Sequence, residues 1–224
     1  MKKWYWILGI GLCGMLAYGQ INFSGDVTLV STYVFRGIKQ CPGPSLQGTM
    51  ALNYKGLSGG LWVSSIGTDD IDTETDPFVE LALPTGEIES ALGLNIYTYD
   101  FFSTFNDTAE YELELYANAS VGMFGLSGYY VPSQKSTKGE LHSSCYWLEC
   151  NVEKELWGGT WSAQLGYGTY CSRYLSTPRK EPVGNLVLTA TKSLTEGLDV
   201  SYAISFGLAK DMENIFVLSV SKSF

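Results

Sequence analysis

Basic residues and histidine are scarce in this 224-residue chain. It has 23 acids against 14 bases and a single histidine, which gives a formal net charge of −9. A nucleic-acid surface needs clustered Lys and Arg, so nucleic acid is excluded as a partner. The one histidine, His142, stands beside Ser143 and Ser144, and the chain has neither metal-ligand spacing nor a glycine-rich phosphate loop. We therefore expect no enzyme activity, no metal site and no cofactor.

Long apolar runs are missing beyond residue 20. No stretch there approaches the roughly 18 to 20 residues that a membrane-spanning helix requires. The apolar run over 4–16 follows two lysines and precedes small residues at 17–19, which is the pattern of a secretory signal peptide. We expect a signal peptide over 1–19, cleaved near Gly19/Gln20, and a mature chain over 20–224. Such a chain is either soluble or crosses a membrane as a β-barrel.

Apolar and polar residues alternate along most of the mature chain. From 198 to 206 the even positions are all apolar, whereas Asp199, Ser201 and Ser205 occupy odd positions. A period of two is that of a β-strand with one apolar and one polar face. Similar alternation predicts twelve strands, over residues 22–36, 44–56, 58–66, 76–84, 86–100, 109–120, 122–132, 142–156, 158–171, 181–194, 196–209 and 211–224.

The links between these strands alternate in length. Polar links such as 67–76 and 132–141 are long. They alternate along the chain with tight, mostly glycine-containing links at 55–59, 84–86, 120–122, 157–158 and 193–197. Outer-membrane barrels have an even number of antiparallel strands, with short periplasmic turns and longer external loops. Together with the leader and the C-terminal Phe224, these features predict a closed antiparallel transmembrane up-and-down β-barrel of about twelve strands.

Several segments resemble one family of outer-membrane barrels. Residues 31–40 (STYVFRGIKQ), 44–48 (PSLQG) and 60–63 (GLWV) resemble the opening of the TorF family of porins. Residues 77–80 and 92–99 look like its middle hairpin, and 216–224 like its last strand. This resemblance implies a porin-like barrel in the cell outer membrane. The five cysteines depart from that pattern, as does Lys222, where such barrels more often have an apolar or aromatic residue.

If the apolar faces meet lipid, the lumen is acidic. The polar faces point inward with Glu80, Glu89, Glu110, Glu112, Glu114, Glu149, Glu153 and Glu155. Carboxylates attract cations, which predicts a channel for passive diffusion of ions or small solutes that prefers cations. Arg36, at the outer end of the first predicted strand, is a candidate to narrow the lumen or to form a structural salt bridge. The expected partners are outer-membrane lipid, the small solutes or ions, and the outer-membrane assembly machinery through Phe224.

Other functions fit the same pattern. The inward carboxylates could pair with Arg36, Lys55 and Lys192 and fill the barrel, which would then be a non-conducting structural or adhesive protein. A barrel enzyme that acts on lipid or peptide is the third alternative.

Four cysteines remain after cleavage, in an oxidising compartment. If the strands on either side of 157–158 pair, Cys145 comes within reach of Cys171, and a disulfide between them is expected. Cys41 is the main competitor for this bridge. Cys150 alternates onto the lipid face and is expected to be a small apolar residue.

Overall fold

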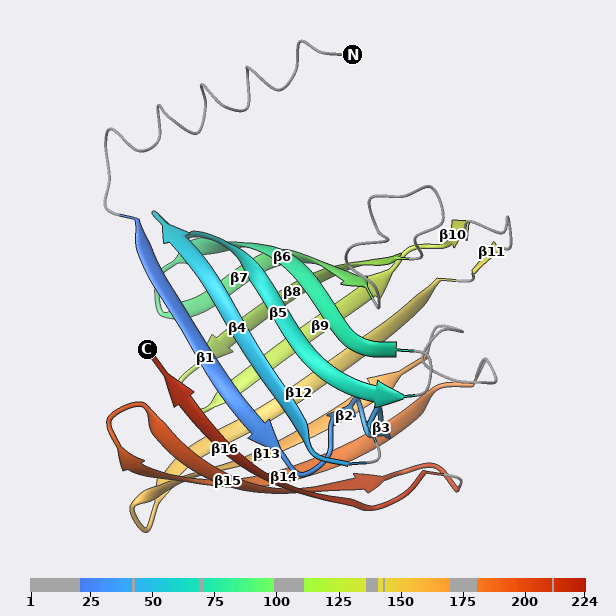
Figure 1. Ribbon diagram of the computed structural model, residues 1–224. Helices are drawn as coiled ribbons and strands as arrows, with labels where there is room; N and C mark the ends of the chain where they lie inside the picture. The colour runs from blue at the N-terminus through green and yellow to red at the C-terminus, as the bar shows by residue number, and fades with distance from the viewer. Residues whose placement is uncertain are drawn as a thin grey trace.

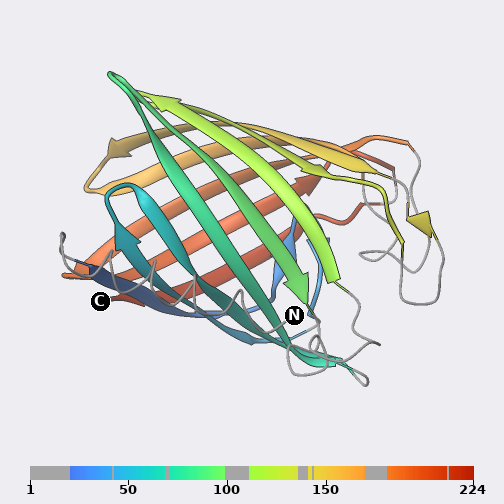
Figure 2. The same ribbon diagram turned by 90° about the horizontal axis from the view of Figure 1, so that it is seen from above.

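Twelve strands form one closed antiparallel barrel in the computed structural model (Figures 1 and 2). The structure describes residues 21–41, 43–68, 71–98, 111–135, 141–142, 144–169, 181–210 and 212–224. These residues contain no helix that is long and apolar enough to cross a membrane. The predicted fold class and strand number are confirmed. The predicted signal peptide over 1–19 lies outside the described residues.

Each barrel strand pairs with its neighbours along the chain, and the first pairs with the last. The strands are β1 (Asn22–Val30), β4 (Ser45–Tyr54), β5 (Leu57–Thr68), β6 (Ile71–Thr85), β7 (Ile88–Thr98), β8 (Tyr111–Val121), β9 (Phe124–Val131), β12 (Cys145–Leu156), β13 (Gly159–Gly168), β14 (Val183–Thr195), β15 (Leu198–Gly207) and β16 (Ile215–Ser223). Two short hairpins are additional to the barrel: β2 (Val34–Phe35) pairs with β3 (Ile38–Lys39), and β10 (Gln134–Lys135) pairs with β11 (Leu141–His142).

One end of the barrel, which we call the turn end, consists of two-residue turns at 55–56, 86–87, 122–123, 157–158 and 196–197. Each contains a glycine with positive φ, as the tight glycine links predicted. In Lys55–Gly56 and Trp157–Gly158 both residues have positive φ, as in the type I′ turns that match the twist of paired strands. The C-terminus lies at this end (Figure 1). The opposite end, with the longer links, is the loop end.

The barrel is apolar outside and polar inside. On β8, Tyr111 and Leu115 are 54% and 47% exposed, whereas Glu112 and Glu114 on the other face are 4% and 1% exposed. The same alternation places Phe216, Leu218 and Val220 of β16 on the outer surface. A soluble barrel would bury its apolar face instead, so this distribution fits a barrel surrounded by lipid.

The C-terminal residues close the barrel at the turn end. Gly25 and Phe224 exchange two backbone hydrogen bonds of 3.1 and 3.0 Å, and the Phe224 ring stacks on Phe23 with 6.0 Å between centroids. The Lys222 Nζ donates a 2.7 Å hydrogen bond to the Glu196 carbonyl in the adjacent turn. This contact accommodates the unusual lysine near the C-terminus.

The first predicted strand, 22–36, is wrong in its second half. β1 ends at Val30, and the Ser31 amide makes a 2.8 Å bond to the Leu218 carbonyl before the chain leaves the wall. The next residues form the β2–β3 hairpin, which the Thr32 hydroxyl closes at its base by a 2.6 Å hydrogen bond to the Cys41 carbonyl. Tyr33 and Phe35 stand two positions apart, as residues on one face of a strand do, and β-branched Val34 lies between them. This local sequence therefore does not distinguish the hairpin from a longer strand.

Candidate functional site in the barrel lumen

The β2–β3 hairpin crosses the barrel interior. Tyr33 packs on Trp62 of β5 with 5.5 Å between ring centroids, and Phe35 packs on Tyr97 of β7 at 5.9 Å. Ile38, on the other leg, packs against the cluster of Trp147 of β12 and Val183 of β14. In the closed sheet, β9 lies six positions from β1 in either direction, and the hairpin tip reaches β9. The hairpin therefore spans the lumen.

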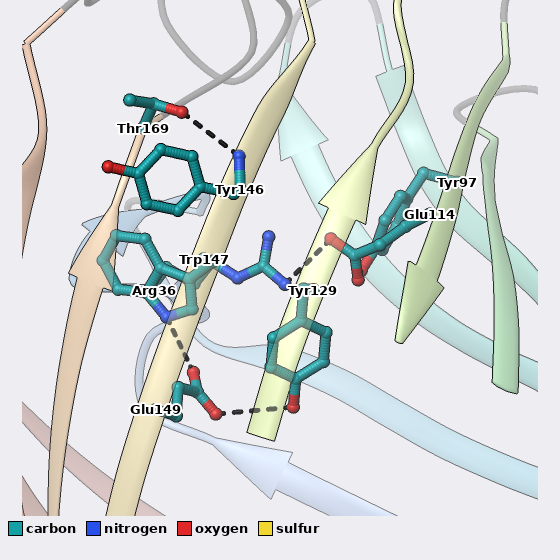
Figure 3. Close-up of polar contacts among 8 residues, drawn as sticks. All are labelled: Arg36, Tyr97, Glu114, Tyr129, Tyr146, Trp147, Glu149 and Thr169. Carbon is teal, nitrogen blue, oxygen red and sulfur yellow. Dashed lines mark hydrogen bonds and ion pairs between the residues drawn. The ribbon is translucent and has the colours of Figure 1, made fainter. Parts of the chain in front are cut away.

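Arg36 is at the tip of this hairpin and forms a buried ion pair. Its Nη2 lies 2.8 Å from Oε2 of Glu114 on β8, and the two side chains are 8% and 1% exposed. The Tyr97 hydroxyl donates a 2.7 Å hydrogen bond to the other carboxylate oxygen, Oε1. Figure 3 shows this carboxylate between the guanidinium and the phenol. Arg36 is thus inside the barrel, not at the outer mouth as the long first strand predicted.

Aromatic rings surround the same guanidinium. Its Cζ lies 4.6 Å from the ring centroids of Phe35 and Tyr129 and 5.8 Å from that of Trp147, within cation–π range. Trp147 is fully buried, and its Nε1 donates a 2.9 Å hydrogen bond to Glu149 (Figure 3). The Tyr129 hydroxyl donates a 3.4 Å bond to the other oxygen of Glu149. We call the barrel residues that receive Arg36 the wall site: Tyr97, Glu114, Tyr129, Trp147 and Glu149.

The other predicted lumen acids lie at several depths. Glu112 is buried two residues nearer to the loop end of β8 than Glu114. Glu80 accepts a 2.9 Å hydrogen bond from the Tyr116 hydroxyl. Glu153 lies toward the turn end and is exposed. Glu110 lies outside the described residues.

Two buried acids were not among the predicted lumen residues. Glu74 and Asp76 were assigned to the polar link 67–76, but β5 runs to Thr68 and β6 begins at Ile71, so both belong to the wall. Both side chains are buried, and Asp76 accepts a 3.1 Å hydrogen bond from the Thr98 amide. The sequence signal for a strand here is the alternation of acids at 74 and 76 with threonines at 73 and 75, which places both acids on one face.

The lysines proposed to neutralise the lumen do not do so. Lys55 Nζ lies 5.3 Å from the ring centroid of Tyr54, and Lys192 donates a 2.6 Å hydrogen bond to the Gly158 carbonyl at the turn end. Within the described ranges, the ion pairs are Arg36–Glu114 and an exposed pair between Lys39 and Glu213. The Lys55 and Lys192 charges are therefore placed at the rim of the barrel.

Two hollow regions remain beside the hairpin and the wall. One, of about 290 Å³, borders Arg36 and Glu149 and has polar groups from Thr32, Gln47, Gln164, Asn185 and Ser205. The other, of about 570 Å³, lies near the turn end and is lined by Glu80, Glu89, Asn118 and Ser120, among others. The hairpin therefore narrows the lumen at the loop end but does not fill the whole interior.

The structure gives the bonding state of three cysteines. Cys145 is disulfide-bonded, whereas the buried Cys41 and the exposed Cys150 have free thiols. Cys41 is therefore not the partner of Cys145, and Cys150 lies on the outer face as expected. Cys171, the predicted partner, lies outside the described residues, so the Cys145–Cys171 bridge stays a prediction.

The closed barrel and its apolar outer face define the class of fold: a porin-like transmembrane β-barrel. The chain belongs to the Gcw_chp family, described as a bacterial protein of unknown function, whose model matches residues 16–221. The comparison with curated proteins found no match.

Three solved structures show the same fold. The KdgM porin has a TM-score of 0.57 at 11% identity, over 90% of this chain and 99% of that one. The NanC porin also has a TM-score of 0.57 at 11% identity, over 89% and 97%. An outer-membrane channel from Pseudomonas putida F1 has a TM-score of 0.51 at 12% identity, over 90% and 95%. At these identities the similarity is one of fold.

Proposed function

We propose that the protein is an outer-membrane channel through which small ions or solutes diffuse passively, with a preference for cations. The fold that the chain shares with two porins and an outer-membrane channel supports this proposal. The resemblance to the TorF family of porins supports the same role. Lipid around the apolar band and assembly through the C-terminal Phe224 are parts of this proposal.

The observation that supports conduction is the hollow, acidic interior beside the hairpin. The larger cavity is lined by Glu80 and Glu89 and by no basic residue of the described ranges. The smaller cavity is lined by Glu149 and by one base, Arg36. Arg36 is already paired with Glu114. A surplus of carboxylates in a narrow, water-accessible passage attracts cations and repels anions.

Single-channel conductance of the leaderless, refolded protein in a planar bilayer tests this proposal. We expect discrete steps, and a reversal potential in a salt gradient that indicates cation preference. Folding is checked independently by heat-modifiable gel mobility. A silent bilayer from protein that is folded by this criterion would contradict conduction.

Selective neutralisation tests the origin of the cation preference. Replacing Glu89 and Glu153 together by Gln should move the reversal potential toward zero, because it removes two carboxylates from the turn-end half. Glu112→Gln and Glu114→Gln should do the same, but Glu114→Gln also removes the partner of Arg36. Glu213→Gln is the matched control, since this exposed acid pairs with Lys39 at the loop end. An equal shift in the control would mean that overall charge, not the lumen, sets the preference.

The second candidate is a non-conducting structural or adhesive barrel. It is favoured by the packing of the hairpin, whose aromatic residues contact β5 and β7 and whose Arg36 contacts β9 across the interior. A silent bilayer would support it. Catalysis is not part of either proposal: the lone His142 lies in β11 at the loop end, and we expect purified barrel to hydrolyse neither phospholipid nor peptide.

A further inference from the structure

The wall site is assembled without help from the hairpin. Tyr97 bonds Glu114, and both Trp147 and Tyr129 bond Glu149, so each carboxylate and each ring is oriented by another wall residue. The five residues come from β7, β8, β9 and β12, which are consecutive strands of the closed sheet. Rigid neighbouring strands that support one another's side chains make a preorganised site.

The chemistry of the wall site is that of a receptor for a planar organic cation. Glu114 offers an oxygen at 2.8 Å to one edge of the bound guanidinium, and the Tyr129 ring lies 4.6 Å from its central carbon. Trp147 adds a second aromatic ring of the wall, and Glu149 adds a second carboxylate behind these rings. A guanidinium uses both kinds of contact, because it combines a donor fork with a flat, weakly hydrated face.

Arg36, which occupies the wall site, belongs to the same chain but lies on the β2–β3 hairpin and not on a barrel strand. Arg36 occupies the left-handed region at φ 50, which is unfavourable for a residue with a side chain, and it is held at the tip of a two-residue turn. The hairpin joins the barrel through the ends of β1 and β4. The cavity of about 290 Å³ borders both Arg36 and Glu149, so a small molecule has room beside the occupied site.

We propose that the wall site binds small organic cations that bear a guanidinium group, and that Arg36 is an internal occupant with which these solutes compete. A solute that takes the Glu114 carboxylate releases the hairpin tip from the far wall. Guanidinium-bearing solutes are then the substrate class of the channel. Passage of the solute rests on the proposed channel function, whereas its binding to the wall site does not.

Methylguanidinium binding to the detergent-folded barrel tests this inference without any need for conduction. The variants are Arg36→Ala, which empties the site, and Arg36→Lys, which retains a charge without the planar fork. The readout is the rise in unfolding temperature on adding methylguanidinium chloride, against tetramethylammonium chloride at the same ionic strength. We expect apparent affinity to increase from the natural protein to Arg36→Lys to Arg36→Ala. If Arg36→Ala does not fold, the Lys variant still tests displacement.

The wall carboxylate provides the specific control. Adding Glu114→Gln to Arg36→Ala should weaken methylguanidinium binding about tenfold, as expected for one charge-assisted hydrogen bond. Equal stabilisation by the two cations in Arg36→Ala would overturn the inference, and so would equal binding with and without Glu114. Binding in detergent with a silent bilayer would uphold the site and reject the channel. Conduction without specific methylguanidinium binding would support the channel and reject the proposed binding site.

Discussion

The loop-end and turn-end halves of the barrel differ in what occupies them. In the loop-end half, a hairpin crosses the lumen, and the acids Glu74, Asp76, Glu112 and Glu114 are buried. In the turn-end half, the strands are joined by two-residue turns, Glu153 is exposed, and a cavity of about 570 Å³ remains. The two halves have the same strands and the same alternation. Their difference shows that the width of this lumen is set by an inserted loop segment, not by the number of strands.

The two halves even use the same local geometry. Arg36–Gly37 in the lumen and Lys55–Gly56 at the turn end are both two-residue turns with positive φ at both positions. Arg36 contacts a buried carboxylate and three rings, whereas the Lys55 Nζ lies near the ring of its neighbour Tyr54. The surroundings of the turn, not its conformation, therefore separate a functional candidate from a simple connection.

Removing the charge at the hairpin tip should have the largest effect. Arg36→Ala leaves the Glu114 carboxylate buried with no cation, and breaking a buried pair in this way costs about 3 to 5 kcal/mol. The measurement is the free energy of unfolding from urea titration in micelles. The double variant Arg36→Ala with Glu114→Gln should recover much of the loss, because it removes the stranded charge. A double variant no more stable than the single one would show that packing of the arginine, not its charge, holds the hairpin.

The disulfide of Cys145 should stabilise the loop-end half alone. A bridge from Cys145 to Cys171 would close a loop that contains the 157–158 turn, and its reduction should lower the free energy of unfolding by about 3 kcal/mol. Non-reducing peptide mapping should recover Cys145 and Cys171 in one joined fragment. Cys150→Ala is the matched control, since Cys150 is a free cysteine of the same strand. A fragment that joins Cys145 to another cysteine would reject the pairing.

Much of the barrel could be predicted from the sequence because period-two alternation and glycine turns are local signals. Phe216, Leu218 and Val220 are expected and found on the outer face. Likewise, Trp157–Gly158 is expected and found as a tight turn. Such signals depend on residues close in the chain, so they can be recognised without knowledge of the tertiary structure.

The candidate site was less predictable because it depends on contacts distant in the chain. Arg36 was singled out, and a salt bridge was one of its expected roles. However, its partner Glu114 is 78 positions away (114 − 36), and no local pattern selects it over the other lumen acids. The Tyr33 and Phe35 rings alternate as strand residues would, which concealed the hairpin. The aromatic ring of Trp147 was missed because one inward tryptophan has no sequence signal of its own.

A matched pair of glycine substitutions separates turn strain from lumen packing. Gly37→Ala and Gly56→Ala both place a side chain at a strongly positive φ, 81° and 84°, which costs about 1 kcal/mol in each. At Gly37 the added Cβ would also lie 2.9 Å from the Asn185 Cβ, whereas at Gly56 the nearest atom is 3.5 Å away. We expect a total loss of about 2 kcal/mol for Gly37→Ala, measured by urea unfolding. Equal losses would mean that the tip is loosely packed.

The smallest effect is expected at the base of the same hairpin. The Lys39 Nζ lies 3.6 Å from the Glu213 carboxylate, and the side chains are 42% and 76% exposed. Water and salt weaken such a pair, so Lys39→Ala should change the free energy of unfolding by less than about 0.5 kcal/mol, a loss smaller still at high salt. Urea titrations at low and high ionic strength measure this. A loss as large as that of Arg36→Ala would place the anchor of the hairpin at its base, and the tip would then be free to leave the wall site at little cost.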